Sequence, residues 1–90
     1  MQDIDQLRSE IDQIHTQLGT LFKRRLVLTQ KIWTIKKAQG LALIDQNREE
    51  QIIHQFDQST SDSLEQKALR GFFKSLLVES KRFLEGQNFK

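Results

Sequence analysis

The chain has 90 residues, with 14 Lys and Arg against 12 Asp and Glu and a formal net charge of +2. This length suits one domain over residues 1–90, which alone would bury only about 60% of its unfolded surface, so oligomerisation would ease a marginal core. With no cysteine, a polar N-terminus and only short apolar runs, the sequence excludes disulfides, thiolate metal sites, a signal peptide and a membrane span, and we expect a cytoplasmic protein.

A single long helix is predicted over residues 4–39. Proline is absent and glycine occurs at only four positions, which favours uninterrupted helices and an all-α fold class. Asp3 and Gln6 resemble a capping box at the start of this helix, and Gly40 is a natural terminator. Apolar residues recur in alternating steps of three and four and form a heptad seam: Ile4, Leu7, Ile11, Ile14, Leu18, Leu21, Leu28, Ile32 and Ile35. A helix of about 54 Å cannot be covered by its own short chain.

Two shorter helices are predicted at residues 46–56 and 63–85. Asp45 is a suitable N-cap for the first of them, because a short side-chain oxygen can accept from the free backbone N–H groups there. Asp62 and Glu65 form a second capping-box pattern, and an apolar stripe of helical period follows. The sequence therefore predicts a long, a short and a medium helix.

Arg25 stands where the steps of the seam predict an apolar residue. A guanidinium that faces inward is costly unless a carboxylate or an anion meets it, so the position indicates either an internal ion pair or an anionic ligand. Lys36 lies eleven residues further, on nearly the same face and about 16 Å along the axis, with Ile32 between them. The two cations could hold a small dicarboxylate, and they also fit a solvated basic face.

Arg8 flanks the same seam but precedes Arg25 by seventeen residues, roughly 25 Å along the helix. It cannot reach the same ligand within one chain. If two such helices pack antiparallel through the seam, Arg8 of one chain approaches Arg25 of the other. A site shared across a dimer interface is then geometrically possible.

Polar residues of the second and third helices are further candidates. Asp45 is adequately explained by capping, whereas Arg48 gains nothing from the helix dipole and indicates an acidic neighbour or a ligand. Glu49 is suited to accept a hydrogen bond from a hydroxyl, or to pair with Arg48 or a lysine. Ser80 falls within the apolar stripe, so its hydroxyl points inward, although most such serines only bond to their own helix.

Taken together, these residues resemble the all-helical (AroQ-type) chorismate mutase family over nearly the whole chain. Leu-Arg-Ser-Glu-Ile-Asp at 7–12 looks like the family's opening motif, Lys-Arg-Arg at 23–25 like its paired-basic segment, and Ile-Asp-Gln-Asn-Arg-Glu at 44–49 like its Asp-x-x-Arg-Glu signature. Lys36 and Ser80 match the family's lysine and serine in placement. The resemblance implies an intertwined helical homodimer that needs no cofactor and no metal.

The resemblance also implies an isomerase that converts chorismate to prephenate by a Claisen rearrangement in phenylalanine and tyrosine biosynthesis. Lys36 would stabilise negative charge on the ether oxygen, Arg25 would bind a carboxylate and Glu49 would accept the ring hydroxyl. Arg8 would reach the site from the partner chain. The expected substrate contacts are Arg8, Arg25, Lys36, Asp45, Arg48, Glu49, Ser80 and Glu85.

One position departs from the family pattern. Four residues after its serine the family usually places a glutamine, sometimes a glutamate, that hydrogen-bonds the ether oxygen, and this chain has Leu84 there. Glu85 is adjacent but rotated by about 100° around the helix. We expect Glu85 to substitute as the donor only if the last helix is kinked or shifted by one residue.

Other functions remain open. The same pocket could act on isochorismate or aminodeoxychorismate, or belong to a degenerate regulatory domain that binds such a ligand without turnover. Six cations between residues 21 and 40 are unopposed by any acid and also fit a helical nucleic-acid binder: Lys23, Arg24, Arg25, Lys31, Lys36 and Lys37. We expect no nucleic-acid partner, because part of this charge fits the family's pocket and the near-neutral net charge gives little overall attraction.

Overall fold

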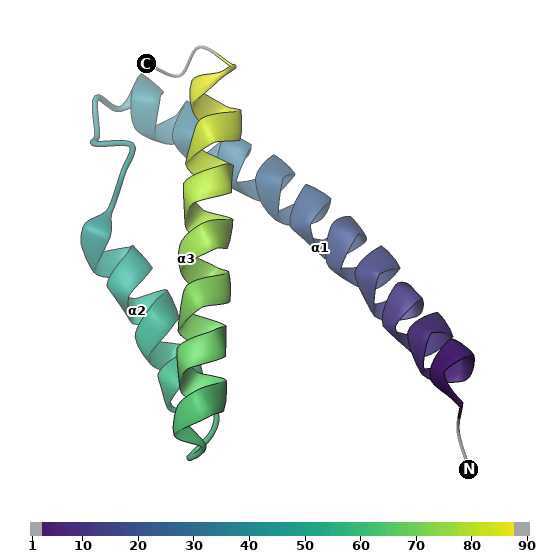
Figure 1. Ribbon diagram of the computed structural model, residues 1–90. Coiled ribbons are helices and arrows are strands. Elements are labelled where there is room, and N and C mark those ends of the chain that lie inside the picture. Colours follow the sequence, from purple (N-terminus) through teal and green to yellow (C-terminus); the bar gives the residue numbers. More distant parts are fainter. Residues whose placement is uncertain (1–2, 88–90) are drawn as a thin grey trace.

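The structure, a computed structural model, describes residues 3–87 as three α-helices (Figure 1). These are α1 (Ile4–Ala38), α2 (Gln46–Asp57) and α3 (Ser63–Glu85). No strand occurs between residues 3 and 87, so the predicted all-α class with three helices is confirmed. Within the same residues, none of the helices combines the length and the apolar character that crossing a membrane requires.

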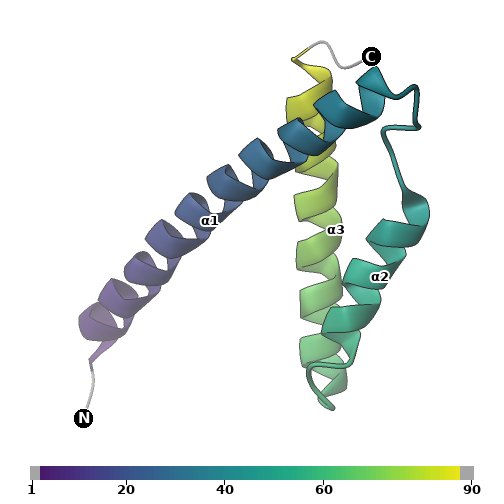
Figure 2. The same cartoon turned by 180° about the vertical axis from the view of Figure 1, so that it is seen from behind.

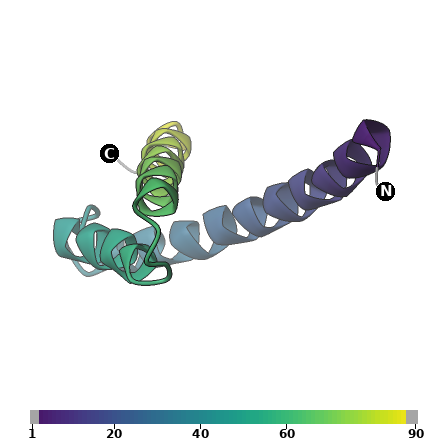
Figure 3. The same ribbon diagram turned by 60° about the horizontal axis from the view of Figure 1, so that its bottom comes forward.

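α2 and α3 run antiparallel side by side, and the C-terminal half of α1 crosses the C-terminal half of α3 (Figures 1 and 2). The N-terminal half of α1 projects away from the other two helices as a free arm, which Figure 3 shows from below. The radius of gyration is 16.5 Å, whereas a compact domain of this length would have about 12 Å. The single chain is therefore an open arrangement of helices.

Each helix begins at an aspartate that caps it. The carboxylate of Asp3 accepts from the backbone N–H of Gln6 at 2.8 Å, and that of Asp45 accepts from the N–H of Arg48 at 3.1 Å. Asp62 accepts from two backbone N–H groups at the start of α3. The three N-caps are confirmed, since short acidic side chains satisfy the free N–H groups and suit the positive end of the helix dipole. The capping box expected at Asp62 is not formed, because the Glu65 carboxylate accepts from the Thr60 hydroxyl and the N–H of Asp62 donates to that hydroxyl.

α1 ends in a tight turn at Gly40. This glycine has φ +68°, in the left-handed region, and the backbone N–H of Leu41 donates to the carbonyl of Lys36 at 2.8 Å. The N–H of Gly40 donates to the carbonyl of Lys37 at 3.2 Å, which completes a Schellman motif. The turn redirects the chain after Ala38, and the loop that leads to α2 passes close enough to α1 for the carbonyl of Leu43 to lie 3.5 Å from Nζ of Lys36.

α2 is held to α3 by aromatic and polar contacts at the end remote from α1. The rings of Phe56 and Phe73 stack with centroids 3.9 Å apart, and Arg70 forms a 2.7 Å ion pair with Asp57. The side-chain amide of Gln66 donates to the carbonyl of Asp57, the last residue of α2, and to that of Thr60 in the connecting loop. These contacts fasten the C-terminal end of α2 to the N-terminal half of α3.

The core of the single chain is very small. Among residues 3–87 only Trp33, Leu77, Leu84 and Ser80 are buried. The apolar seam of α1 stays exposed, with Ile14 52% and Leu21 58% accessible. So much exposed apolar surface on one helix face is typical of an interaction surface.

Candidate active site

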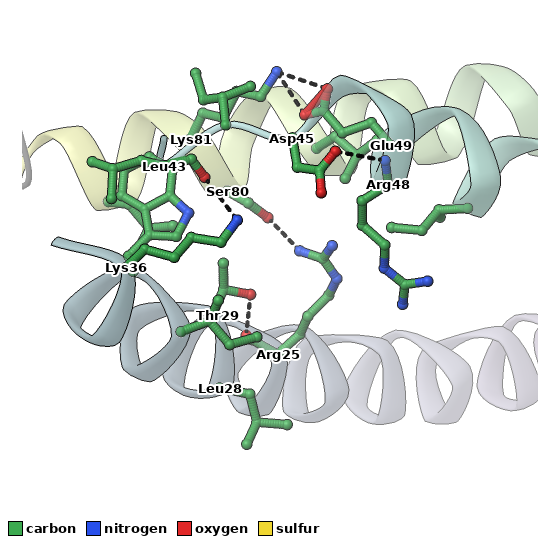
Figure 4. Close-up of a pocket in the computed structure, with 16 residues that line it drawn as sticks. Arg25, Leu28, Thr29, Lys36, Leu43, Asp45, Arg48, Glu49, Ser80 and Lys81 are labelled. Carbon is green, nitrogen blue, oxygen red and sulfur yellow. Dashed lines mark hydrogen bonds and ion pairs between the residues drawn. The ribbon is translucent and has the colours of Figure 1, made fainter. Parts of the chain in front are cut away.

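A pocket of about 280 Å³ lies where α1, α3 and the start of α2 meet (Figure 4). Its size is near the lower end of small-molecule sites, which begin at about 300 Å³. The polar and charged residues that line it are Arg25, Thr29, Lys36, Asp45, Arg48, Glu49, Ser80 and Lys81. The apolar lining consists of Leu28, Ile32, Trp33, Leu43, Ile44, Ile52, Leu77 and Leu84.

Arg25 reaches across the pocket from α1 to α3, where its Nη1 donates a 3.0 Å hydrogen bond to the hydroxyl of Ser80. Ser80 is buried and donates in turn to the carbonyl of Leu76 at 2.8 Å. Burial lowers the pKa of Arg25 below its usual value, the nearby cation Arg48 lowers it further, and Glu49 raises it. No carboxylate between residues 3 and 87 forms an ion pair with Arg25. Of the two explanations left open by the sequence, this geometry favours the anionic ligand.

Lys36 extends from the last turn of α1 into the same space (Figure 4). Its Nζ is 3.5 Å from the carbonyl of Leu43, at the limit of hydrogen bonding, and within residues 3–87 it forms no ion pair. An ammonium so weakly engaged keeps donors free for a ligand.

The N-terminal turn of α2 brings three charged residues to the pocket. The Asp45 carboxylate is used by the cap, which fixes the backbone of this turn. The side chain of Arg48 points from α2 toward α1, on the side where Arg25 rises (Figure 4). Glu49 faces α3, where its carboxylate pairs with Lys81.

Lys81 is the one charged lining residue that the sequence did not suggest. Its Nζ is 2.7 Å from one carboxylate oxygen of Glu49 and 3.1 Å from the other. Ser80 precedes it, and that inward position was the only local signal. A lysine at the edge of an apolar stripe is usually solvated, so only the packing of α2 beside α3 reveals this pair.

Two expected site residues lie outside the pocket. Arg8 is exposed on the projecting arm of α1, as its distance from Arg25 along the helix requires. Glu85 is also exposed, because α3 continues as a regular helix to this residue and turns Leu84 inward instead. Leu84 is 1% accessible and forms part of the pocket wall. The shift of α3 that would bring Glu85 to the pocket does not occur.

The pocket carries a surplus of positive charge, with four cations facing two carboxylates. Across residues 3–87, no three His, Cys, Asp or Glu side chains gather as a metal site would require. The arrangement offers one guanidinium anchored to a hydroxyl, a second guanidinium, a mobile ammonium and a carboxylate above an apolar floor. Such a site can bind a small apolar ring that carries carboxylate groups.

Residues 7–85 match the family model described as chorismate mutase type II. The match covers most of the chain and includes every residue of the pocket. No match was found among curated proteins.

Proposed function

The chain belongs to the chorismate mutase type II family, and we propose that it rearranges chorismate to prephenate. In this Claisen reaction the carbon–oxygen bond of the enol ether breaks while a carbon–carbon bond forms, with no nucleophile and no proton transfer to the protein. Catalysis then depends on holding the side chain of the substrate over its ring and on stabilising charge that develops in the transition state.

The observation that carries the proposal is the convergence of Arg25, Lys36 and Arg48 on one small pocket, where none of them forms an ion pair with another residue between 3 and 87. Chorismate is a dicarboxylate, and a guanidinium binds a carboxylate through two parallel hydrogen bonds. We assign Arg25 and Arg48 to the carboxylates. Ser80 already fixes the direction of the Arg25 guanidinium, so little rotamer freedom is lost when the substrate binds.

Lys36 is assigned to the ether oxygen. Its ammonium projects from the end of α1 with a single long contact of 3.5 Å to a backbone carbonyl. A cation placed beside the oxygen that gains negative charge stabilises the transition state more than the ground state. Glu49 would accept the hydrogen bond of the ring hydroxyl, and Asp45 would hold the turn that presents Glu49.

We propose further that the active protein is a homodimer in which Arg8 enters the pocket of the partner chain. The exposed seam of α1 supports this, because Leu7, Ile11 and Ile14 would be covered by a second copy. An antiparallel partner helix would also bring Arg8 toward the middle of α1, where Arg25 lies. Arg8 of one chain would then join Arg25 and Arg48 of the other as the third cation that binds the substrate carboxylates.

Leu84 supports a second candidate function, a domain that binds chorismate or prephenate without turnover. The side chain that lines the pocket at this position is apolar and buried. The family directs two donors, a lysine and usually a glutamine, to the ether oxygen, and this chain has only the lysine, Lys36. Loss of one such donor lowers rates by about 10²- to 10³-fold in other enzymes.

The proposal is tested by following the loss of chorismate absorbance with purified protein and identifying prephenate as the product. Lys36→Ala should abolish turnover and leave the helical fold and the assembly unchanged. Lys31→Ala is the matched control, because Lys31 is an exposed lysine of α1 outside the pocket. Near-normal activity of Lys36→Ala would refute the assignment. Parallel assays with isochorismate and aminodeoxychorismate distinguish the related substrates.

A further inference from the structure

Lys81 and Glu49 form an ion pair at the edge of the pocket that the mechanism above does not use. Nζ of Lys81 lies 2.7 Å from one oxygen of Glu49 and 3.1 Å from the other, so the ammonium straddles the carboxylate. The two side chains come from α3 and from the first turn of α2, 32 residues apart in the sequence. Both line the pocket, with side chains 31% and 22% accessible.

The ion pair restricts the orientation of the Glu49 carboxylate but leaves some of its hydrogen-bond acceptor sites free. A carboxylate offers about four lone-pair sites, two on each oxygen, and Lys81 occupies one side of the group. The remaining sites stay available to a donor from the pocket. Glu49 is in the first turn of α2, and the contact with Lys81 of α3 holds its carboxylate in one orientation at the pocket.

We propose that Lys81 is a positioning residue: it fixes the Glu49 carboxylate as the acceptor for the ring hydroxyl of the substrate and disfavours a substrate with an ammonium group at that position. The inference rests on the proposed function, because the hydroxyl contact of Glu49 belongs to that proposal. It also names a substrate class, a hydroxylated cyclic dicarboxylate in preference to its amino analogue.

The preference follows from charge. A lone carboxylate would attract an alkylammonium group more strongly than a neutral hydroxyl. Lys81 neutralises this carboxylate and places a positive charge within a few ångströms of the substituent, so an ammonium there meets a like charge. A hydroxyl donates to the carboxylate without this repulsion. Lys81 therefore favours chorismate over aminodeoxychorismate.

The experiment compares Lys81→Gln, Lys81→Arg, Glu49→Gln and the double variant Glu49→Gln/Lys81→Gln. We expect Lys81→Gln to lower kcat/KM for chorismate about tenfold, because a misplaced acceptor weakens a hydrogen bond to a charged group. Lys81→Arg should restore most of the activity, since a guanidinium can straddle the same carboxylate. Lys74→Gln, an exposed lysine two turns earlier on α3, is the matched control and should behave as the parent chain.

Two readouts separate positioning from a merely structural role. If Lys81 acts through Glu49, adding Lys81→Gln to Glu49→Gln should cause little further loss, whereas independent losses would multiply. The preference for chorismate over aminodeoxychorismate should also fall in Lys81→Gln and return in Lys81→Arg. Multiplied losses, or an unchanged preference, would overturn the proposal for Lys81.

The affinity of the same single and double variants for chorismate, measured by calorimetry, separates failure of the Lys81 proposal from failure of the proposed mutase activity. If the parent chain turns chorismate over and the losses of the two single variants multiply in the double variant, only the proposal for Lys81 is refuted. Binding without turnover, combined with dependent losses in affinity, refutes the mutase activity and supports the role of Lys81. Absence of both binding and turnover overturns both proposals.

Discussion

Arg25 and Ser80 are 55 residues apart in the sequence, and in the fold the guanidinium of one donates a 3.0 Å hydrogen bond to the hydroxyl of the other. This bond joins α1 to α3 across the pocket. The buried Ser80 hydroxyl in turn donates to the carbonyl of Leu76 at 2.8 Å, so it both accepts and donates a hydrogen bond. The Arg25 guanidinium is therefore already oriented before a ligand binds.

Ser80→Ala should therefore weaken catalysis while leaving the fold intact. Arg25 would keep its charge but lose the partner that directs it, and we expect kcat/KM to fall about tenfold, the equivalent of one modest hydrogen bond to a charged group. Circular dichroism and melting should change little, because alanine is a better helix former than serine. Ser63→Ala, on the exposed first turn of α3, is the control. Unchanged kcat/KM in Ser80→Ala would show that the hydrogen bond does not matter for the substrate.

Arg25→Met should stabilise the protein and remove its activity. Burial and the neighbouring Arg48 lower the pKa of Arg25, so the folded chain disfavours this charge relative to the unfolded chain. A methionine removes the repulsion and keeps the apolar part of the side chain in place, and Ser80 retains its bond to Leu76. We expect only a small rise in the Tm, of at most a few degrees, at equal protein concentration, because the guanidinium is partly exposed and solvent screens much of this cost. A lower Tm would mean that the bond to Ser80 outweighs the cost of burying the cation.

The outline of the fold could be predicted because its signals are local. The caps at Asp3, Asp45 and Asp62 and the left-handed turn at Gly40 depend on a few neighbouring residues. Arg25 was identifiable for the same reason, since it interrupts a regular apolar period.

The pair between Lys81 and Glu49 could not be predicted, because it depends on how α2 lies against α3. The same holds for the choice between Leu84 and Glu85. Rotation of α3 decides which of the two faces the pocket, and the sequence pattern allowed a shift of one residue that the helix does not make.

Leu84→Gln should increase mutase activity. The leucine side chain is buried in the pocket wall, so a glutamine there would direct an amide donor toward the bound ether oxygen. We expect kcat to rise by about 10²-fold and the stability to fall by about 1–3 kcal/mol, because the amide is unsatisfied without substrate. Glu85→Gln is the control and should leave kcat unchanged, since Glu85 is exposed outside the pocket. No gain in Leu84→Gln would indicate that the ether oxygen lies elsewhere.

Gly40→Ala should destabilise the turn that follows Lys36. At φ +68° a Cβ costs about 1–2 kcal/mol, and no atom within 4 Å of the added Cβ contributes a further clash. Chemical denaturation should show this loss as a lower free energy of unfolding. The KM for chorismate should change by less than the equivalent free energy. Gly71→Ala, at a helical glycine of α3 with equally open space, should instead stabilise by up to about 1 kcal/mol. A neutral Gly40→Ala would mean that the turn relaxes to another conformation.

Mixing two inactive variants tests whether Arg8 is donated between chains. Arg8→Ala and Arg25→Ala should each lack activity, because each removes one cation from every site. In a mixed dimer, the pocket of the Arg8→Ala chain keeps its own Arg25 and receives Arg8 from the other chain, so one site of two is intact. After the dimers exchange subunits at equal concentrations, half of them are mixed, and about a quarter of the parental activity should return.

Size-exclusion chromatography with light scattering should show dimers throughout this experiment. Replacing Ile14 by aspartate places a charge in the exposed seam of α1 and should abolish both the dimer and the recovered activity. If the mixture stays inactive although mixed dimers form, Arg8 serves its own chain or none. If the Ile14 variant remains dimeric, the seam is not the interface, because a buried unpaired carboxylate at its centre would cost more than a marginal core can tolerate.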